Sequence, residues 1–241
     1  TLSRTRTKES PEYNGPRIAS MELTENTPST LTTRANTLST GVYFRLIVFR
    51  KSGNNYVFQS AADYTSNGAS SPVLKKGKLL TRSGTIRVIG YSFNTTAALG
   101  DIPASYTYNT TKIDIPNMNN DFMTYDSGDI ANVNSLNYNL PVTFKQKLCK
   151  LTISISVTGF TSNTISGCTG VYVKQGGNST SWVIGSSAVA ANTSNTASFN
   201  PNTNQTTTIH MVPFASSRTI TVHFNKLTVG NLIANNADNI D

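Results

Sequence analysis

Short runs of alternating apolar and polar residues begin at Gly41 and recur along the rest of the chain. A period of two is the pattern of a β-strand that buries one face. The first clear run is Gly41–Arg50, which places on one face Val42, Phe44, Leu46 and Val48. A turn follows at Ser52–Asn55, so Tyr56–Gln59 is predicted to form a hairpin with this strand.

Two longer runs carry apolar residues on both parities. In Thr85–Phe93 the apolar residues occupy both faces, which predicts a central or bulged strand. In Val142–Val157 the apolar parity changes near Leu148. Because successive side chains point to opposite faces of a strand, this slip predicts a bulge or a strand break at that point.

The two ends of the chain differ in their predicted structure. Residues 1–15 are polar and charged and are predicted to be a disordered leader, and 18–23 form a short, isolated strand on a flexible tether. Further strands are predicted late in the chain, at Gly170–Gln175, Ser181–Ile184, Thr206–Val212, Arg218–Phe224 and Leu227–Leu232.

Short strands separated by turns, without helical periodicity, are typical of β-sandwiches. The chain has 241 residues, enough for two domains of roughly 100 residues each. The loop-rich, acidic region before Leu140 is taken as their boundary. We predict an all-β protein with a leader and first strand in 1–38, an N-terminal β-sandwich in 39–138 and a C-terminal β-sandwich in 139–241.

Composition narrows the classes of function. Only 13% of the residues are charged and 37% are hydrophobic, and Asn, Ser and Thr fill the difference, which suits strands with one solvated face. The net charge of +8 is spread without a dense basic run, so we predict a solvated basic surface and no nucleic-acid partner. No apolar stretch approaches the roughly 20 residues that a membrane-spanning helix needs.

The residues needed for a catalytic or metal site are scarce. The two histidines, His210 and His223, lie in strand-like runs, where a packed or half-exposed side chain is the usual role. Asp121, Asp126 and Asp129 cluster in a predicted loop, but the Gly and Glu pattern of a calcium loop is missing. Loop structure is therefore preferred to a cation site. We predict no catalytic residue, no metal and no cofactor, and hence no enzyme.

The acidic region contains four tyrosines, Tyr106, Tyr108, Tyr125 and Tyr138. Their role allows two interpretations. The preferred interpretation packs them at the junction between the two predicted domains. The alternative makes them the exposed aromatic platform of a surface carbohydrate-binding module.

The two cysteines leave another choice open. Cys149 shares the parity of the apolar residues that follow it, and Cys168 lies beyond a predicted turn. A disulfide between them would stabilise the fold by about 3 kcal/mol through loop closure. Two free, buried thiols are the alternative.

Several short motifs, in order along the chain, resemble the fimbrillin family of fimbrial and cell-adhesion proteins of Bacteroides-type bacteria. They are Thr33-Arg34-Ala35, Gly84–Asn94, Asn120-Asp121-Phe122-Met123, Leu140–Ile153 and Met211-Val212-Pro213. In the fourth motif, Gln146 stands where the family usually has His, and Cys149 where it has a small residue. Each match is short, but together they cover most of the chain.

This resemblance implies two tandem transthyretin-like β-sandwiches with Greek-key-like connections. It implies a fimbrial subunit or fimbria-associated cell-adhesion protein, exported as a lipoprotein precursor to the cell surface and outer membrane. The implied partners are other fimbrial subunits, with host or bacterial surface proteins or glycans as further candidates. Contact with the membrane would come only through a lipoprotein anchor that is later removed.

The resemblance also implies assembly by β-strand exchange. In the pilin members, an arginine-specific protease removes the first strand and opens a groove for a strand of the next subunit. Carried over to this chain, the scissile bond follows Arg34, with Arg17 as the alternative site. A polar residue in an exposed loop is the simpler role for Arg34. Family members usually add a closing strand beyond the position of Leu232, so the C-terminal sandwich either lacks that strand or is a shorter form.

Overall fold

The computed structural model describes residues 17–23, 38–68, 70–115, 121–133, 137–154, 165–169, 171–173, 180–190, 197–199, 206–211, 222–229 and 232–238. Every regular element in these ranges is a β-strand, so the predicted all-β class is confirmed. No helix of the described ranges has the length and apolar character to cross a membrane.

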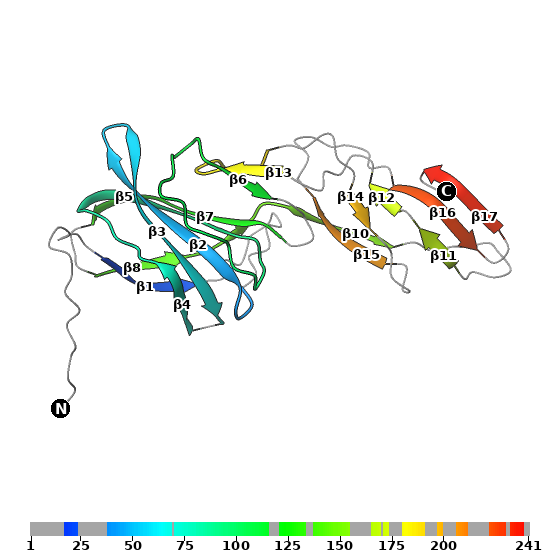
Figure 1. Cartoon of the computed structure of the whole chain (residues 1–241), viewed down its shortest axis with the longest axis horizontal. Coiled ribbons are helices and arrows are strands. Elements are labelled where there is room, and N and C mark those ends of the chain that lie inside the picture. The colour runs from blue at the N-terminus through cyan, green and yellow to red at the C-terminus, as the bar shows by residue number, and fades with distance from the viewer. Residues whose placement is uncertain are drawn as a thin grey trace, which may run out of the picture.

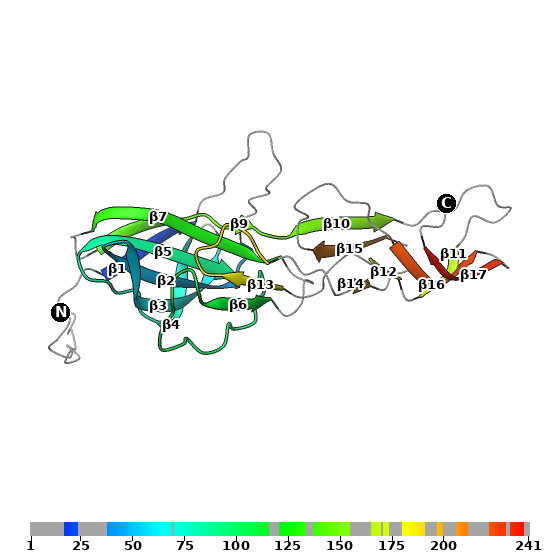
Figure 2. The same ribbon diagram turned by 90° about the horizontal axis from the view of Figure 1, so that it is seen from above.

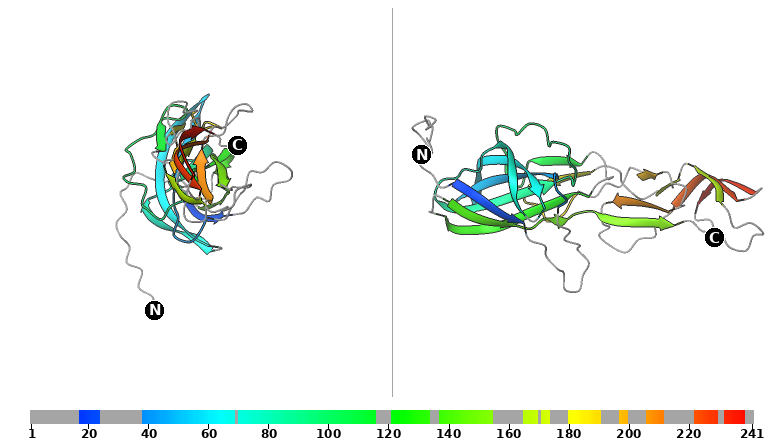
Figure 3. Two further views of the ribbon diagram at one scale, coloured as in Figure 1. Left: turned by 90° about the vertical axis from the view of Figure 1, so that its right-hand side faces the viewer. Right: turned by 90° about the horizontal axis from the view of Figure 1, so that it is seen from below.

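The strands are numbered in the order in which they occur along the chain. They are β1 (Arg17–Leu23), β2 (Tyr43–Ser52), β3 (Asn55–Asn67), β4 (Ser70–Gly77), β5 (Gly84–Ser92), β6 (Lys112–Ile115), β7 (Met123–Val133), β8 (Asn137–Val142), β9 (Lys145–Gln146), β10 (Cys149–Ser154), β11 (Ile165–Thr169), β12 (Val171–Val173), β13 (Thr180–Val183), β14 (Ala197–Phe199), β15 (Thr206–Met211), β16 (Val222–Val229) and β17 (Leu232–Asp238). They form two groups along the long axis of the molecule, with β1–β9 and β13 in one and the remaining strands in the other (Figures 1 and 2). The view from below shows the same arrangement, whereas in the view along the axis the two groups overlap (Figure 3).

The first group is organised around a six-stranded antiparallel sheet with the order β4-β3-β2-β5-β7-β9. β2 and β3 form the predicted hairpin, in which Ser52 pairs with Asn55 and Gly53 adopts a φ of 61° in the turn. β5 lies between β2 and β7 and pairs with both. Its apolar residues on both faces predicted this central position.

The sheet buries an apolar cluster on each face. The first cluster includes Phe44, Leu46, Val48, Ile86, Val88, Leu140, Val142 and Phe144. The second cluster includes Ile47, Phe49, Ile89, Tyr91, Tyr106, Ile115, Phe122, Leu148, Trp182 and Ile184. Because alternate residues of β2 and β5 enter different clusters, both strands are buried on both faces.

Different elements cover the two faces. β8 supplies Leu140 and Val142 to the first cluster, and β1 pairs with β8 in parallel, with Met21 opposite Leu140. On the other face, β6 and β13 form an antiparallel pair in which Trp182 lies opposite Ile113. The large sheet is therefore the middle layer of three.

The segment 140–148 crosses from one face of the sheet to the other. Phe144 belongs to the first cluster and Leu148 to the second, and between them the backbone N–H of Lys147 donates to the carbonyl of Phe122 at 2.8 Å. The predicted slip near Leu148 is thus a strand break between β9 and β10. This segment and β13 share the core of the large sheet, although they fall within 139–241. The division into 39–138 and 139–241 itself stays a prediction.

The second group contains two smaller sheets. β10 pairs with β15, and β16 pairs with β11, β12 and β17. The prediction of separate strands at Arg218–Phe224 and Leu227–Leu232 was wrong, because β16 runs without a break from Val222 to Val229. β17 was not predicted, because Ala234–Ala237 have no alternation of apolar and polar residues. Its pairing with β16 defines it.

A buried ion pair joins β2 to β3 on the second face of the large sheet. The Nε and Nη2 of Arg45 donate to the two carboxylate oxygens of Asp63 at 2.6 and 2.8 Å. Nη2 also donates to the carbonyl of Gly100, while Nη1 donates to the carbonyl of Asp101 and to the hydroxyl of Tyr106. All five N–H groups of the guanidinium are used, which meets the condition for burying its charge.

We expect Asp63→Asn to lower the free energy of unfolding by about 3–5 kcal/mol, because it leaves the buried charge of Arg45 without its counter-ion. Urea denaturation monitored by circular dichroism measures this loss. The matched control is Asp101→Asn, which removes the partner of Lys76 at an exposed position and should cost far less. Equal losses in the two variants would contradict the structural role of the Arg45–Asp63 pair.

Candidate functional site

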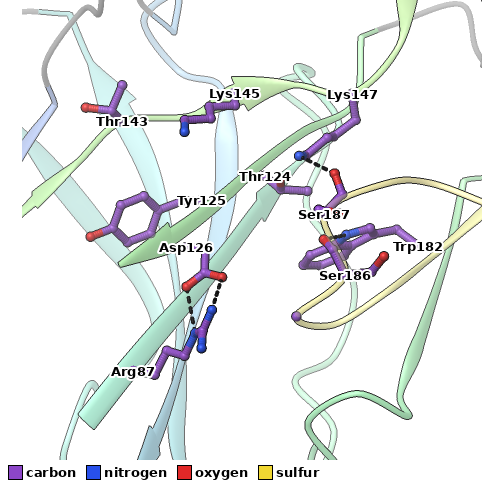
Figure 4. Close-up of a pocket in the computed structure, with 11 residues that line it drawn as sticks. Arg87, Thr124, Tyr125, Asp126, Thr143, Lys145, Lys147, Trp182, Ser186 and Ser187 are labelled. Carbon is purple, nitrogen blue, oxygen red and sulfur yellow. Dashed lines mark hydrogen bonds and ion pairs between the residues drawn. The ribbon is translucent and has the colours of Figure 1, made fainter. Parts of the chain in front are cut away.

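A pocket of about 390 Å³ opens where four segments of the first group meet. β5 supplies Arg87, β7 supplies Thr124–Asp126, the chain around β9 supplies Thr143, Lys145 and Lys147, and the end of β13 with the following turn supplies Trp182 and Gly185–Ser187 (Figure 4). Its volume lies in the range of small-molecule sites, roughly 300–1,000 Å³. Its lining contains three cationic side chains, from Arg87, Lys145 and Lys147, and one carboxylate, from Asp126.

A β-bulge in β7 shapes one side of the pocket. Asp126 and Asp129 fall in the predicted loop, but the residues Asp126–Asp129 continue the strand with a shift of register against β5. Gly128 adopts a φ of 64°, the side chain of Asp126 accepts from its N–H at 2.9 Å, and Ser127 Oγ accepts from the N–H of Val88 at 2.8 Å. The turn-forming residues thus produce a bulge, because pairing with β5 holds both flanks of the segment in the sheet.

The bulge holds Asp126 against Arg87. The Nε and Nη2 of Arg87 donate to the two carboxylate oxygens of Asp126 at 2.8 and 2.6 Å. This pair raises the pKa of Arg87. The same guanidinium lies 5.5 Å from the ring centre of Tyr56 and 5.3 Å from that of Tyr108, which fixes its orientation. The charge of Arg87 is therefore matched within the protein.

The turn after β13 closes the opposite side. Trp182 is only 2% exposed, and its Nε1 donates to the carbonyl of Ser186 at 2.9 Å. Lys147 Nζ donates to the carbonyl of Ser187 at 2.8 Å. Gly185 allows this turn, because its φ is 89° and a Cβ at this position would come within 2.7 Å of the Tyr108 ring.

Two lysines project from the β9 segment. Lys145 is exposed and Lys147 is half-buried. Burial, and then the neighbouring charge of Lys145, lower the pKa of Lys147. Among the described residues, neither lysine forms an ion pair with a carboxylate. An anion that entered the pocket would relieve their mutual repulsion.

The three aspartates of the predicted loop do not converge. Asp121 is buried, Asp126 pairs with Arg87, and Asp129 accepts hydrogen bonds from Lys51 and Tyr56. The bond from Lys51 lowers the pKa of Asp129. In the described part of the chain no group of His, Cys, Asp and Glu side chains could hold a metal ion.

The four tyrosines are divided between the two faces of the sheet. Tyr106 and Tyr108 belong to the second cluster or pack against it, while Tyr125 and Tyr138 do so with the first cluster. The four tyrosines therefore do not form one exposed aromatic platform, which was the alternative interpretation, and their packing at a junction between two domains stays a prediction. Sequence spacing could not show this, because the faces of Tyr106 and Tyr108 depend on how the loop 94–111 folds back over the sheet, whereas Tyr125 and Tyr138 lie in the strands β7 and β8.

The remaining sequence-predicted residues lie outside the pocket. Cys149 begins β10 opposite Met211, and Cys168 lies in β11 opposite Leu227, in a different sheet, so their disulfide stays a prediction. His210 pairs with Lys150 in the backbone register, and His223 with Tyr172 and Asp238. Arg34 lies outside the described residues.

Sequence reasoning missed Arg87, Lys145, Lys147 and Trp182 as a group. The only local signal was the spacing of the two lysines, whose side chains fall on the same parity. Arg87 and Trp182 come from strands that are distant in the sequence, and only the packing of β13 near β5 and β7 brings them to one pocket.

No family model matches the sequence, and no curated protein is significantly similar to it. A candidate cell adhesion protein from Bacteroides uniformis aligns with a TM-score of 0.55 and 15% identity, over 87% of this chain and 79% of that chain. One from Parabacteroides distasonis aligns with a TM-score of 0.51 and 13% identity, over 90% and 76%. The fimbrial anchor protein Mfa2 of Porphyromonas gingivalis aligns at 0.49 and 11%, over 87% and 77%. The first two matches show a shared fold, in agreement with the fimbrillin-like motifs of the sequence.

The buried carboxyl of Asp121 predicts a pH-dependent stability. Asp121 Oδ1 has no hydrogen-bond partner. Burial raises the pKa of Asp121 to about 7, against the opposing effect of backbone N–H donors at Phe122 and Leu148. The unfolded carboxyl titrates near a pKa of about 4. The stabilising contribution is therefore complete below about pH 4 and falls by about 1.4 kcal/mol per pH unit until about pH 7.

Asp121→Asn should remove this pH dependence. The variant should match the wild type near pH 4 and be more stable than the wild type at pH 8. Chemical denaturation at a series of pH values measures the difference, and the comparison at low pH is its internal control. If both proteins lose stability in parallel between pH 4 and 8, Asp121 is not the group responsible.

Proposed function

We propose that this fimbrillin-like chain is a fimbria-associated cell-adhesion protein that assembles with other fimbrial subunits by exchange of a β-strand. The fold shared with two candidate cell adhesion proteins and the fimbrillin-like motifs support the general role. The position of β1 supports the mechanism. The chain acts in binding and assembly and not as an enzyme.

β1 occupies the position that strand exchange requires. It pairs in parallel with β8, with Met21 opposite Leu140 and Leu23 opposite Val142. Leu140 and Val142 are 1% and 0% exposed and form part of the first cluster. Loss of β1 would leave the backbone groups of β8 unpaired beside this apolar cluster. A strand from a second subunit would satisfy both the backbone groups and the apolar surface.

The sequence provides a place where β1 could be released. Arg34 lies between β1 and β2, so cleavage after it would separate β1 from the rest of the chain. Arg17 is the first residue of β1, and cleavage there would leave the strand almost whole. Arg34 is therefore the site that fits removal of the strand.

The proposed location follows from the same resemblance. We place the protein on the bacterial cell surface in a fimbrium, with export as a lipoprotein precursor to the outer membrane. Its proposed partners are other fimbrial subunits, and host or bacterial surface molecules are the proposed adhesion targets. The tandem transthyretin-like domain arrangement belongs to the same proposal.

Treatment of the purified chain with an arginine-specific protease tests the assembly mechanism. We expect loss of the segment up to Arg34 from a resistant core, followed by growth into oligomers. After the loss of β1, the backbone groups of β8 can be paired by a strand from another subunit. Intact mass and size-exclusion chromatography follow the two steps together.

Two matched variants sharpen this experiment. Arg34→Lys should block both the cleavage and the assembly, whereas Arg17→Lys should leave both unchanged. A cleaved core that lacks β1 and remains a stable monomer would exclude strand exchange for this chain.

A further inference from the structure

We propose that the pocket between β5, β7, β9 and the turn after β13 binds an acidic saccharide, with the carboxylate of the sugar held by Lys145 and Lys147. This proposal concerns what the surface recognises. It does not depend on strand exchange, and the two proposals can fail separately.

The charge of the pocket lining favours an anionic ligand. Arg87 is neutralised by its two hydrogen bonds to Asp126. Lys145 and Lys147 remain, and in the described part of the chain no carboxylate forms an ion pair with either. Figure 4 shows both lysines on one side of the pocket, with the Arg87–Asp126 pair on the other side. An incoming cation would meet this excess positive charge, whereas a single carboxylate would neutralise part of it.

The donors of the lysines are suitably placed. Lys147 uses one N–H on the carbonyl of Ser187, and both residues line the pocket. An ammonium carries three N–H donors, so two remain for a ligand. Lys145, two residues earlier, adds a second ammonium to the lining on the Thr143 side of Lys147 (Figure 4), and in the proposed complex it contacts the other carboxylate oxygen. Charge-assisted hydrogen bonds of this kind are about twice as strong as neutral ones.

The rest of the lining matches a sugar. The lining includes the hydroxyl-bearing side chains of Thr124 and Ser187, whereas the hydroxyl of Tyr125 donates to the carbonyl of Pro141 and Ser186 Oγ bonds the backbone of Ala188. Hydroxyls and the backbone carbonyls of the turn can exchange hydrogen bonds with the hydroxyls of a sugar ring, which both donate and accept. The indole of Trp182 supplies an apolar wall.

Hydrogen bonds within the protein hold the backbone on two sides of the pocket. The turn is held by the bonds from Trp182 to Ser186 and from Lys147 to Ser187. The opposite side is held by the bulge of β7 and its pairing with β5. A site held on both sides loses little conformational freedom on binding, which favours affinity for a small ligand.

Calorimetric titration of the full chain with sodium glucuronate and with glucose tests the proposal. We expect saturable binding of glucuronate and none of glucose. The chain has a single tryptophan, Trp182, so a parallel change in its fluorescence would locate the sugar in this pocket. Binding should also weaken as the salt concentration rises.

Three variants complete the test. Lys145→Gln and Lys147→Gln should each weaken glucuronate binding about tenfold, because each removes a charge-assisted hydrogen bond. Lys112→Gln, which removes an exposed lysine of β6 outside the pocket, should leave the affinity unchanged. Thermal unfolding confirms that each variant is folded.

Four results would overturn the assignment. They are the absence of saturable binding, equal binding of glucose, an affinity unaffected by Lys145→Gln, and tighter binding of a short peptide with one aspartate than of glucuronate. The last result would identify the pocket as a site for an acidic peptide.

Discussion

The arrangement of the second face of the large sheet depends on the buried pair of Arg45 and Asp63. A charged pair at 2% and 3% exposure is tolerated only when all its hydrogen-bonding groups are satisfied. The protein meets this condition with the carbonyls of Gly100 and Asp101 and the hydroxyl of Tyr106. These three groups belong to the loop after β5, so satisfying Arg45 fixes that loop over the sheet.

The position of this loop determines the position of the pocket. Tyr106 and Tyr108 lie two residues apart in the loop, and Tyr108 packs against Phe49, Tyr56 and the guanidinium of Arg87. The same ring limits the space at Gly185 in the turn after β13. The ion pair of Arg45 and Asp63 therefore fixes the loop that carries Tyr108. Through Tyr108, this loop contacts Arg87 on one side of the pocket and Gly185 on the other side.

Several elements could be predicted from the sequence because their signals are local. The hairpin of β2 and β3 follows from a period of two on each side of a turn at Gly53. The central place of β5 follows from its two apolar faces, and the break before β10 follows from the change of parity at Leu148. The rest depends on contacts between distant segments. The pairing of Trp182 with Ile113 has no local signal, and Arg45 appears in the sequence as one more polar residue of an alternating strand.

The edges of the large sheet explain why assembly by strand exchange would involve β8. One edge is β4, where Pro72 removes a backbone donor and Lys75 and Lys76 add charge. Beyond β9, the other edge is the part of β7 that carries the bulge at Gly128. Both edges thus have features that discourage addition of another strand.

β8 differs from both edges. It has no charged residue, and its buried Leu140 and Val142 join it to the first cluster. Pro141 removes one donor, but the other backbone groups of β8 still need a partner when β1 is absent. Strand addition at β8 would cover an apolar cluster and complete a backbone ladder at once. The acidic-ligand pocket lies on the opposite face of the sheet, with Trp182 of the second cluster in its wall, so a subunit added at β8 would leave it open.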